Sequence, residues 1–511
     1  MFSRTRSHSV WLAEAPLTGY PELRENLDAD VAVIGGGIAG LTTALELQRA
    51  GQNVVLLEAE RLGCGVTGAS TAKVTSLHGA IYRRIEQKFD AEAARLYAEA
   101  NQAGLEHIAG RAEEMLAHSV DCQFERRSAF TCTFDGSEIE LIREEAEAAR
   151  RAGLPAEATS DVGLPFPVPA AVRVENQAQF HPYRYCVGLA RLLTDAGGRI
   201  YEHVRAQNVS DPGDDGYCTV ALPEGELRAR HVVIATLLPF LDRGAYFAQT
   251  HPSRSYGIAV SLNEAAPEGM YINVESPTRS VRPMPDGRRI LVVGEEHKVG
   301  QDDDTRDRYA ELEAWTRKHF AVQSVDHRWS AQDNIPVDDL PYIGPLDRET
   351  DRIWTATGFN KWGLTTGSVA ALILKELILG KRHPWAELFD STRTDVLPSA
   401  KEFVTQNLNV AAHYVGDRLK ALVAEPVDQL APGDGAIVEL DGEKVAAFRD
   451  DSGNLHACSP ICTHMGCYVL WNRAERSWDC PCHGSRFATD GQILQGPALD
   501  PLEKIDPSGD Q

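Results

Sequence analysis

The chain has 511 residues, of which 43% are hydrophobic, and its formal net charge is −23. A chain of this length exceeds what one hydrophobic core usually serves, so two to four domains are expected. The negative charge is spread along the chain without a basic stripe, which argues against nucleic acid and against an anionic membrane surface as partners.

The first predicted elements form a β-α-β unit. Residues 31–34 (VAVI) are β-branched or small and predict a strand. Residues 41–50 are good helix formers with an apolar stripe, and Gly51 follows as a stop signal. Residues 53–58 (NVVLLE) predict a second strand. This order of elements is typical of a nucleotide-binding domain.

A glycine-rich turn joins the first strand to the helix. Gly35, Gly37 and Gly40 have the G-x-G-x-x-G spacing, which lets main-chain N–H groups approach a pyrophosphate at a helix N-terminus. Glu58 ends the second strand, where a carboxylate can accept hydrogen bonds from ribose hydroxyl groups. The motif predicts an adenine dinucleotide site but does not choose between FAD and NAD.

The middle of the chain, after residue 58, mixes helical and strand patterns, and the last part is all-β. Helices are expected at residues 81–116, 138–152, 183–196 and 366–379, and strands at residues 231–235, 256–262, 289–293 and 352–356. From residue 426 onward, short strands alternate with turns such as Pro432-Gly433 and Asp441-Gly442. The change in pattern indicates a separate C-terminal domain.

Two Cys-His pairs near the C-terminus form a metal-ligand pattern. Cys462-x-His464 is followed by Cys480-x-x-His483. Two thiolates and two imidazoles from two loops suit a [2Fe-2S] centre in which one iron binds both sulfurs and the other both nitrogens. Cysteine and histidine at these spacings also bind structural zinc. The pattern alone therefore predicts a metal centre and leaves both metals open.

The length of the apolar runs and the placement of the other cysteines indicate in which cellular compartment the protein is expected. No apolar run approaches the roughly 20 residues of a membrane-spanning helix, and residues 1–6 are not followed by the apolar core of a signal peptide. We therefore expect a cytoplasmic protein with no membrane span. Five scattered cysteines suggest buried or free thiols rather than a disulfide framework. They are Cys64, Cys122, Cys132, Cys186 and Cys218.

The C-terminal motif resembles that of Rieske iron-sulfur domains, and the resemblance favours [2Fe-2S] over zinc. Cys467 and Cys482 stand within the ligand loops, where the Rieske proteins of quinol-oxidising complexes carry a disulfide, and Gly484-Ser485 also matches that subgroup. The resemblance implies a Cys467–Cys482 disulfide. It implies the metal ligands Cys462, His464, Cys480 and His483.

Residues 11–393 resemble the D-amino-acid-oxidase-like FAD-dependent oxidoreductases, which include glycine, sarcosine and γ-glutamylputrescine oxidases. The matching motifs include residues 61–71 (RLGCGVTGAST), Ala235-Thr236, and residues 356–365 (ATGFNKWGLT). The family implies FAD as the cofactor. The FAD contacts that it implies are Gly35, Gly37, Ile38, Ala39, Gly40, Glu58, Arg61, Thr67, Gly68, Ala69, Ser70, Thr71, Ala235, Thr236, Gly358, Gly363, Leu364 and Thr365.

Together these features predict the fold class. We expect an α/β, Rossmann-like FAD-binding domain with a mixed α+β substrate domain, and a small all-β C-terminal Rieske domain. The oxidoreductase region is expected at residues 1–385, a connecting segment at 386–424 and the Rieske domain at 425–511. Within the first region, the discontinuous FAD-binding domain is expected at roughly 28–110, 170–240 and 330–385.

Candidate catalytic residues are Arg282, Lys361 and Trp362. Arg282 precedes a glycine turn in a region where the family often has a substrate or flavin contact, and the other two lie in a glycine-rich flavin loop. His181 is expected to cap a helix or to pack. Cys64 and His78 do not match the positions of the family's covalent flavin links, so noncovalent FAD is expected.

The two motifs suggest a two-electron to one-electron converter. We expect an amine or amino acid to be oxidised at FAD by a dehydrogenase acting on a C–N bond, with single electrons passing through the cluster to an unknown acceptor. Two alternatives remain open: a non-catalytic electron carrier or redox sensor, and a reductase in which electrons flow from cluster to flavin. A Rieske oxygenase is disfavoured because flavin motifs occupy the large domain, where a mononuclear iron site would have to lie.

Overall fold

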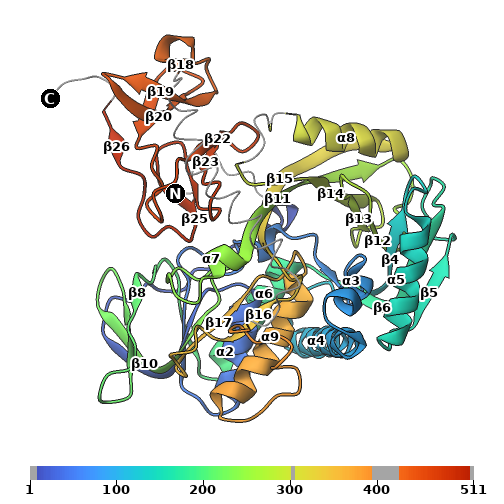
Figure 1. Cartoon of the computed structure of the whole chain (residues 1–511), viewed down its shortest axis with the longest axis horizontal. Coiled ribbons are helices and arrows are strands. Elements are labelled where there is room, and N and C mark those ends of the chain that lie inside the picture. Colours follow the sequence, from blue (N-terminus) through green and yellow to red (C-terminus); the bar gives the residue numbers. More distant parts are fainter. Residues whose placement is uncertain (1–8, 301–304, 306, 394–424, 507–511) are drawn as a thin grey trace.

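The computed structural model describes residues 9–300, 305, 307–393 and 425–506. Most of the expected connecting segment, residues 394–424, lies outside the described residues. The described chain forms two large sheets with their helices, and a β-rich C-terminal region. In Figure 1 this region lies above α7 (Tyr246–Gln249) and above the pair formed by β11 (Thr250–Leu262) and β15 (Val322–Pro336).

The first sheet has eight strands and contains the glycine turn. Its main path is β16-β17-β10-β1-β2-β7, with β9 on β10 and β8 on β9. The central strand β1 pairs in parallel with β2 and β10, and its residues 31–34 are buried, as expected for β-branched side chains in a covered parallel sheet. The strands are β1 (Leu27–Ile34), β2 (Val54–Leu57), β7 (Arg199–Tyr201), β8 (Asn208–Val209), β9 (Cys218–Ala221), β10 (Glu226–Ile234), β16 (Tyr342–Pro345) and β17 (Ile353–Thr357).

Helices pack on one another against this sheet. α2 contacts both α9 and α6, and α4 contacts α9, so segments distant in sequence meet beside the glycine turn (Figure 1). The helices are α1 (Val10–Ala13), η1 (Thr67–Ala69), α2 (Ile38–Arg49), α3 (Ile81–Lys88), α4 (Ala91–Ala117), α5 (Ile139–Arg151), α6 (Pro182–Asp195), α7 (Tyr246–Gln249), α8 (Arg308–His319) and α9 (Gly363–Ile378).

The expected helix at residues 81–116 is two helices. The chain leaves helical geometry at Phe89, and the carboxylate of Asp90 accepts a hydrogen bond from Ala93 N at 2.8 Å. This N-cap satisfies an N–H group at the start of α4. A second cap was anticipated correctly: His181 is the N-cap of α6 and accepts from Arg184 N.

The second sheet has nine strands. Its path is β15-β11-β14-β13-β12-β4-β6-β3, with β5 on β6. α8 packs on β11 and β14, and α5 packs on β5 and β6. The strands are β3 (Lys73–Val74), β4 (Glu125–Thr133), β5 (Ala156–Thr159), β6 (Ala170–Gln179), β11 (Thr250–Leu262), β12 (Met270–Asn273), β13 (Ser280–Pro283), β14 (Arg289–Lys298) and β15 (Val322–Pro336).

The described C-terminal region contains two smaller sheets, in agreement with the expected all-β domain. One has the order β18-β19-β20-β21-β26 and the other β22-β23-β24-β25. Cys462, Cys480, Trp478 and Phe487 lie in one buried cluster of this region. The strands are β18 (Glu425–Pro426), β19 (Gly435–Leu440), β20 (Glu443–Arg449), β21 (Leu455–Cys458), β22 (Leu470–Asn472), β23 (Ser477–Asp479), β24 (Arg486–Phe487), β25 (Ile493–Gln495) and β26 (Lys504–Ile505), and the 3-10 turn η3 (Val427–Gln429) follows β18.

A helix that crosses a lipid bilayer needs about 20 mostly apolar residues. Within residues 9–300, 305, 307–393 and 425–506, no helix combines the length and apolar character needed to cross a membrane.

Candidate functional site: a dinucleotide cavity and a Cys-His centre

The glycine turn brings three main-chain segments into close approach. A Cβ atom on Gly40 would lie 1.9 Å from the carbonyl oxygen of Gly35, and a Cβ atom on Gly35 would lie 2.4 Å from that of Ala235. Gly35 also has a φ of 111°, which side chains disfavour. These positions need glycine because the turn, the first turn of α2 and the end of β10 meet there.

A cavity of about 650 Å³ begins at this turn. The N-termini of α2 and α9 both contribute to its wall, and the N-cap residues Gly37 and Trp362 make no side-chain cap hydrogen bond. N–H groups at the start of a helix favour anionic or electron-rich ligand atoms. Two helix starts whose N-cap residues make no side-chain bond, on one cavity, fit a cofactor with a pyrophosphate and a polar ring system.

Glu58 lies in the cavity wall where the ribose contact is expected. One carboxylate oxygen accepts from Gly36 N at 2.7 Å and the other from Glu60 N at 2.8 Å. Burial raises the pKa of this carboxyl group. Each oxygen keeps a further lone pair that a ribose hydroxyl can use.

Most of the predicted FAD contacts line this cavity, and five do not. Gly40 serves the close approach described above, and Gly68 does the same, since its Cβ would lie 2.3 Å from Gly63 O. Arg61 donates to Thr18 O at 2.6 Å. The other two are Gly358 and Thr365. The predicted residues that line the cavity are Gly35, Gly37, Ile38, Ala39, Glu58, Thr67, Ala69, Ser70, Thr71, Ala235, Thr236, Gly363 and Leu364.

Two of the candidate catalytic residues line the cavity. Lys361 forms an ion pair with Glu296, and the Trp362 ring stacks on His78 with 4.5 Å between centroids. Arg282 lies outside the lining. Its buried guanidinium donates to the carbonyl oxygens of Thr71, Ala72, Phe180 and Pro283 at 3.0–3.2 Å. In this structure Arg282 therefore supports the second glycine-rich loop from behind.

Lys73 is a cavity residue outside the candidate catalytic set. Its ammonium group is buried, donates to Tyr271 O at 3.2 Å and lies 5.5 Å from the centre of the Trp362 ring. Burial, together with the charge of Arg282, lowers the pKa of Lys73 to about 7. The signal for Lys73 in the sequence is its place two residues after the second glycine-rich loop, residues 61–71.

Cys64 and His78, considered above for a covalent flavin link, also line the cavity. Both ring nitrogens of His78 are hydrogen bonded, at 2.7 Å to Tyr97 OH and at 2.6 Å to Thr75 O. With both nitrogens engaged, His78 offers no free atom for such a link. Noncovalent FAD remains the prediction.

An alanine at Gly40 is expected to abolish FAD binding. Its Cβ would collide with the Gly35 carbonyl oxygen, which cannot move without shifting β1. The glycine turn would then lose the shape that lets its N–H groups approach a pyrophosphate. Bound flavin in the purified protein, read from its visible absorbance, tests this. Gly110→Ala in α4 is the matched control, because nothing lies within 4 Å of that Cβ and alanine stabilises a helix by about 1 kcal/mol over glycine. Full FAD content in Gly40→Ala would contradict the expectation.

The four predicted metal ligands converge at two loop tips. Cys462 and Cys480 are each 1% exposed, and the Cys480 side chain is close enough to lower the pKa of Cys462 to about 7. The rings of His464 and His483 lie 5.1 Å apart, and among the described residues neither Nδ1 atom, though buried, has a hydrogen-bond partner. A buried nitrogen without a partner is costly unless it binds something. Two sulfurs and two free nitrogens fit a [2Fe-2S] centre.

The disulfide between Cys467 and Cys482 is present, and none of the five scattered cysteines forms a disulfide within the described residues, both as expected. The sulfurs of Cys467, Cys480 and Cys482 lie within 4.8 Å of one another. Because two of these are bonded to each other, only Cys480 among the three keeps a thiolate for metal. The disulfide thus ties the two ligand loops together.

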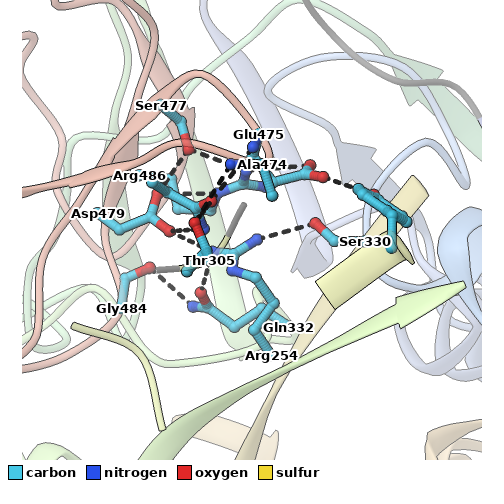
Figure 2. A network of polar contacts seen from close by, with 12 residues as sticks. Arg254, Thr305, Ser330, Gln332, Ala474, Glu475, Ser477, Asp479, Gly484 and Arg486 are labelled. Carbon is cyan, nitrogen blue, oxygen red and sulfur yellow. Dashed lines mark hydrogen bonds and ion pairs between the residues drawn. The ribbon is translucent and has the colours of Figure 1, made fainter. Parts of the chain in front are cut away.

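The C-terminal region contacts the flavin-binding region at two places: at the cavity beside the glycine turn, and at strands β11 and β15 of the second sheet. Residues 494–499 line the same cavity as the glycine turn. Figure 2 shows a buried network in which Arg254 contacts Asp479 at 3.0 Å and Gln332 donates to Gly484 O at 2.8 Å. Gly484 has a φ of 79°, and a Cβ there would lie 2.7 Å from Pro252 Cβ, so this junction also depends on a glycine.

Comparisons with known proteins agree with the two motifs. The family described as FAD dependent oxidoreductase matches residues 30–377, and the Rieske [2Fe-2S] domain matches residues 420–506. A protein of Bacillus subtilis described as a Rieske 2Fe-2S iron-sulfur protein, YhfW, is 35% identical over 99% of each chain.

Other relatives cover the flavin-binding region. Gamma-glutamylputrescine oxidoreductase of Escherichia coli is 24% identical, over 73% of this chain and 88% of its own. The crystal structure of glycine oxidase from Geobacillus kaustophilus has a TM-score of 0.60 at 17% identity, covering 72% of this chain and 99% of its own, and it shows the shared fold. The chain therefore belongs to the FAD dependent oxidoreductase family and carries a C-terminal Rieske [2Fe-2S] domain.

Proposed function

We propose that the protein oxidises an amine or amino acid at FAD and passes electrons singly through the Rieske centre to an acceptor. Residues of the Rieske domain and of the flavin motifs line one cavity, and this observation carries the proposal. A flavin takes two electrons from an organic substrate and a [2Fe-2S] cluster carries one. Two such groups in one chain suit a dehydrogenase.

The class of substrate is supported by the relatives and by the cavity. Gamma-glutamylputrescine oxidoreductase and glycine oxidase are named for amine and amino-acid substrates. The second sheet contributes polar groups to the cavity, among them Asn273 and Glu296, which can accept hydrogen bonds from an amine. With a pKa of about 7, part of the Lys73 population carries a neutral amine near neutral pH and can act as a proton acceptor in the cavity.

An anaerobic panel of amines and amino acids tests the proposal. We expect at least one compound to bleach the flavin absorbance and then to produce the EPR signal of a reduced Rieske cluster. The flavin is expected to change before the cluster because an organic substrate donates two electrons at once, which the flavin can accept and the cluster cannot. Flavin bleaching that never leads to cluster reduction would refute the electron path. A cluster and flavin that no compound reduces, but that dithionite reduces, would favour a carrier instead.

A further inference from the structure

The two histidines of the Cys-His centre face the flavin-binding region. His464 Nε2 lies 3.1 Å from a carboxylate oxygen of Asp242, and the ring of His483 packs edge-on against Phe247 with 5.2 Å between centroids. Asp242 lies in the loop that follows β10, and Phe247 lies in α7. The side chain of His464 is only 7% exposed as a result. Both histidines are therefore seated on one short segment of the flavin-binding region.

The ring nitrogen of His464 that is left for iron determines which way the hydrogen bond between His464 and Asp242 runs. Its buried Nδ1 has no partner among the described residues and is the atom left for iron. A histidine that binds metal through Nδ1 carries its proton on Nε2, so Nε2–H donates and Asp242 accepts. A carboxylate acceptor on a ligating imidazole increases the electron donation of that imidazole to the metal. This stabilises the more oxidised, more positive state of the centre.

The same segment borders the dinucleotide cavity. Leu237, Leu238 and Phe240 line the cavity, and Asp242 follows two residues later. Two residues of extended chain span at most about 7 Å. Leu499 of the Rieske domain packs against the apolar cluster that includes Leu238 and Phe240. One loop therefore has the cavity at one end and the histidine ligands at the other.

We propose that Asp242 is a positioning residue for the Rieske centre: it holds the histidine face on the flavin-binding region and lowers the reduction potential of the cluster. The contact makes electron exchange between cofactors a process within one chain. This last clause rests on the proposed function, whereas the effect on potential does not depend on any substrate.

The test is a redox titration of the full-length holoprotein with mediators, followed by EPR, at one fixed pH. In Asp242→Asn the acceptor loses its charge at constant size, and the side chain is 55% exposed, so the fold should persist. We expect a positive shift equal to at least a tenfold change in the one-electron equilibrium constant, which is about 59 mV. Asp242→Ala should shift the potential in the same direction.

Asp500→Asn is the matched control. Asp500 is exposed and contacts the cluster loop through its main-chain carbonyl oxygen, which accepts from Thr463 at 2.6 Å. This variant removes the same charge without touching the His464 bond, so it should shift the potential by less than half as much. An unchanged potential in Asp242→Asn, an equal shift in Asp500→Asn, or loss of the cluster from Asp242→Asn would each overturn the tuning role.

The rate of cluster reduction after photoreduction of the flavin tests the contact within one chain. We expect a rate that is independent of protein concentration in the native protein, and at least tenfold slower in Asp242→Ala. A rate proportional to concentration would overturn the contact within the chain. Because light replaces substrate here, an inactive substrate panel would count against the proposed function and leave this result intact.

Discussion

Cys480→Ser is expected to remove the [2Fe-2S] cluster completely while FAD stays bound. The Cys480 thiolate is buried beside Cys462, and a serine hydroxyl is a poor substitute for a thiolate on iron. The predicted flavin contacts lie at other elements, between β1 and α9. Iron analysis and EPR should show no cluster, and the visible spectrum should keep the flavin bands.

Cys458→Ser supplies the control for that experiment. Cys458 is also buried in the Rieske domain, but it lies in β21 and its thiol donates to Ala446 O at 3.7 Å. Its replacement should leave both iron and flavin contents unchanged. A Rieske EPR signal that survives in Cys480→Ser would contradict the assignment of this ligand, and stoichiometric zinc in the native protein would contradict the assignment of the metal.

Asp479→Asn is expected to break the junction between the two domains. Asp479 directly precedes Cys480 and is bonded at 3.0 Å to Arg254 and at 3.3 Å to Arg486, with 4% of its side chain exposed (Figure 2). Burial raises the pKa of Asp479, but the two guanidinium charges and local hydrogen bonds outweigh burial and lower it to about 2. Removing one partner of a buried ion pair costs about 3–5 kcal/mol, because the remaining charge is left uncompensated.

Calorimetric unfolding of the full-length holoprotein measures this loss. Arg254→Met together with Asp479→Asn should recover part of it, since the buried Arg254 charge is then no longer left without its carboxylate partner. Arg151→Met removes an exposed ion pair with Glu86 and should change the unfolding curve little. If Asp479→Asn unfolds like the native protein, the buried pair does not hold the domains together.

The elements that could be predicted from the sequence are those defined by local patterns, because the residues of such a pattern are close together in the chain. The strand, glycine turn and helix around Gly37 could be predicted since each element has its own periodicity and stop signal. The long helix was predicted without its break at Phe89, because tertiary packing and the Asp90 cap decide that position. The role of Arg282 was not visible, since its carbonyl acceptors come from separate segments at residues 71, 72, 180 and 283.

The junction of the domains could not be derived from the sequence. Arg254 and Asp479 are 225 positions apart, and neither belongs to a recognisable motif. Asp242 likewise follows a strand in a loop without a motif, and its contact with His464 exists only because the Rieske domain packs there. Such pairs depend on how two folded units meet, which no local pattern encodes.

Residues 494–499 close part of the cavity wall, and this has a consequence for how the protein matures. Domains generally fold as they leave the ribosome, the N-terminal ones first. The dinucleotide cradle is then complete, but open, until the last part of the chain has been made. A flavin that enters during that interval meets a more open cavity than one that enters after residues 494–499 are in place. The domain that lacks the flavin motifs thus completes part of the wall around the flavin site.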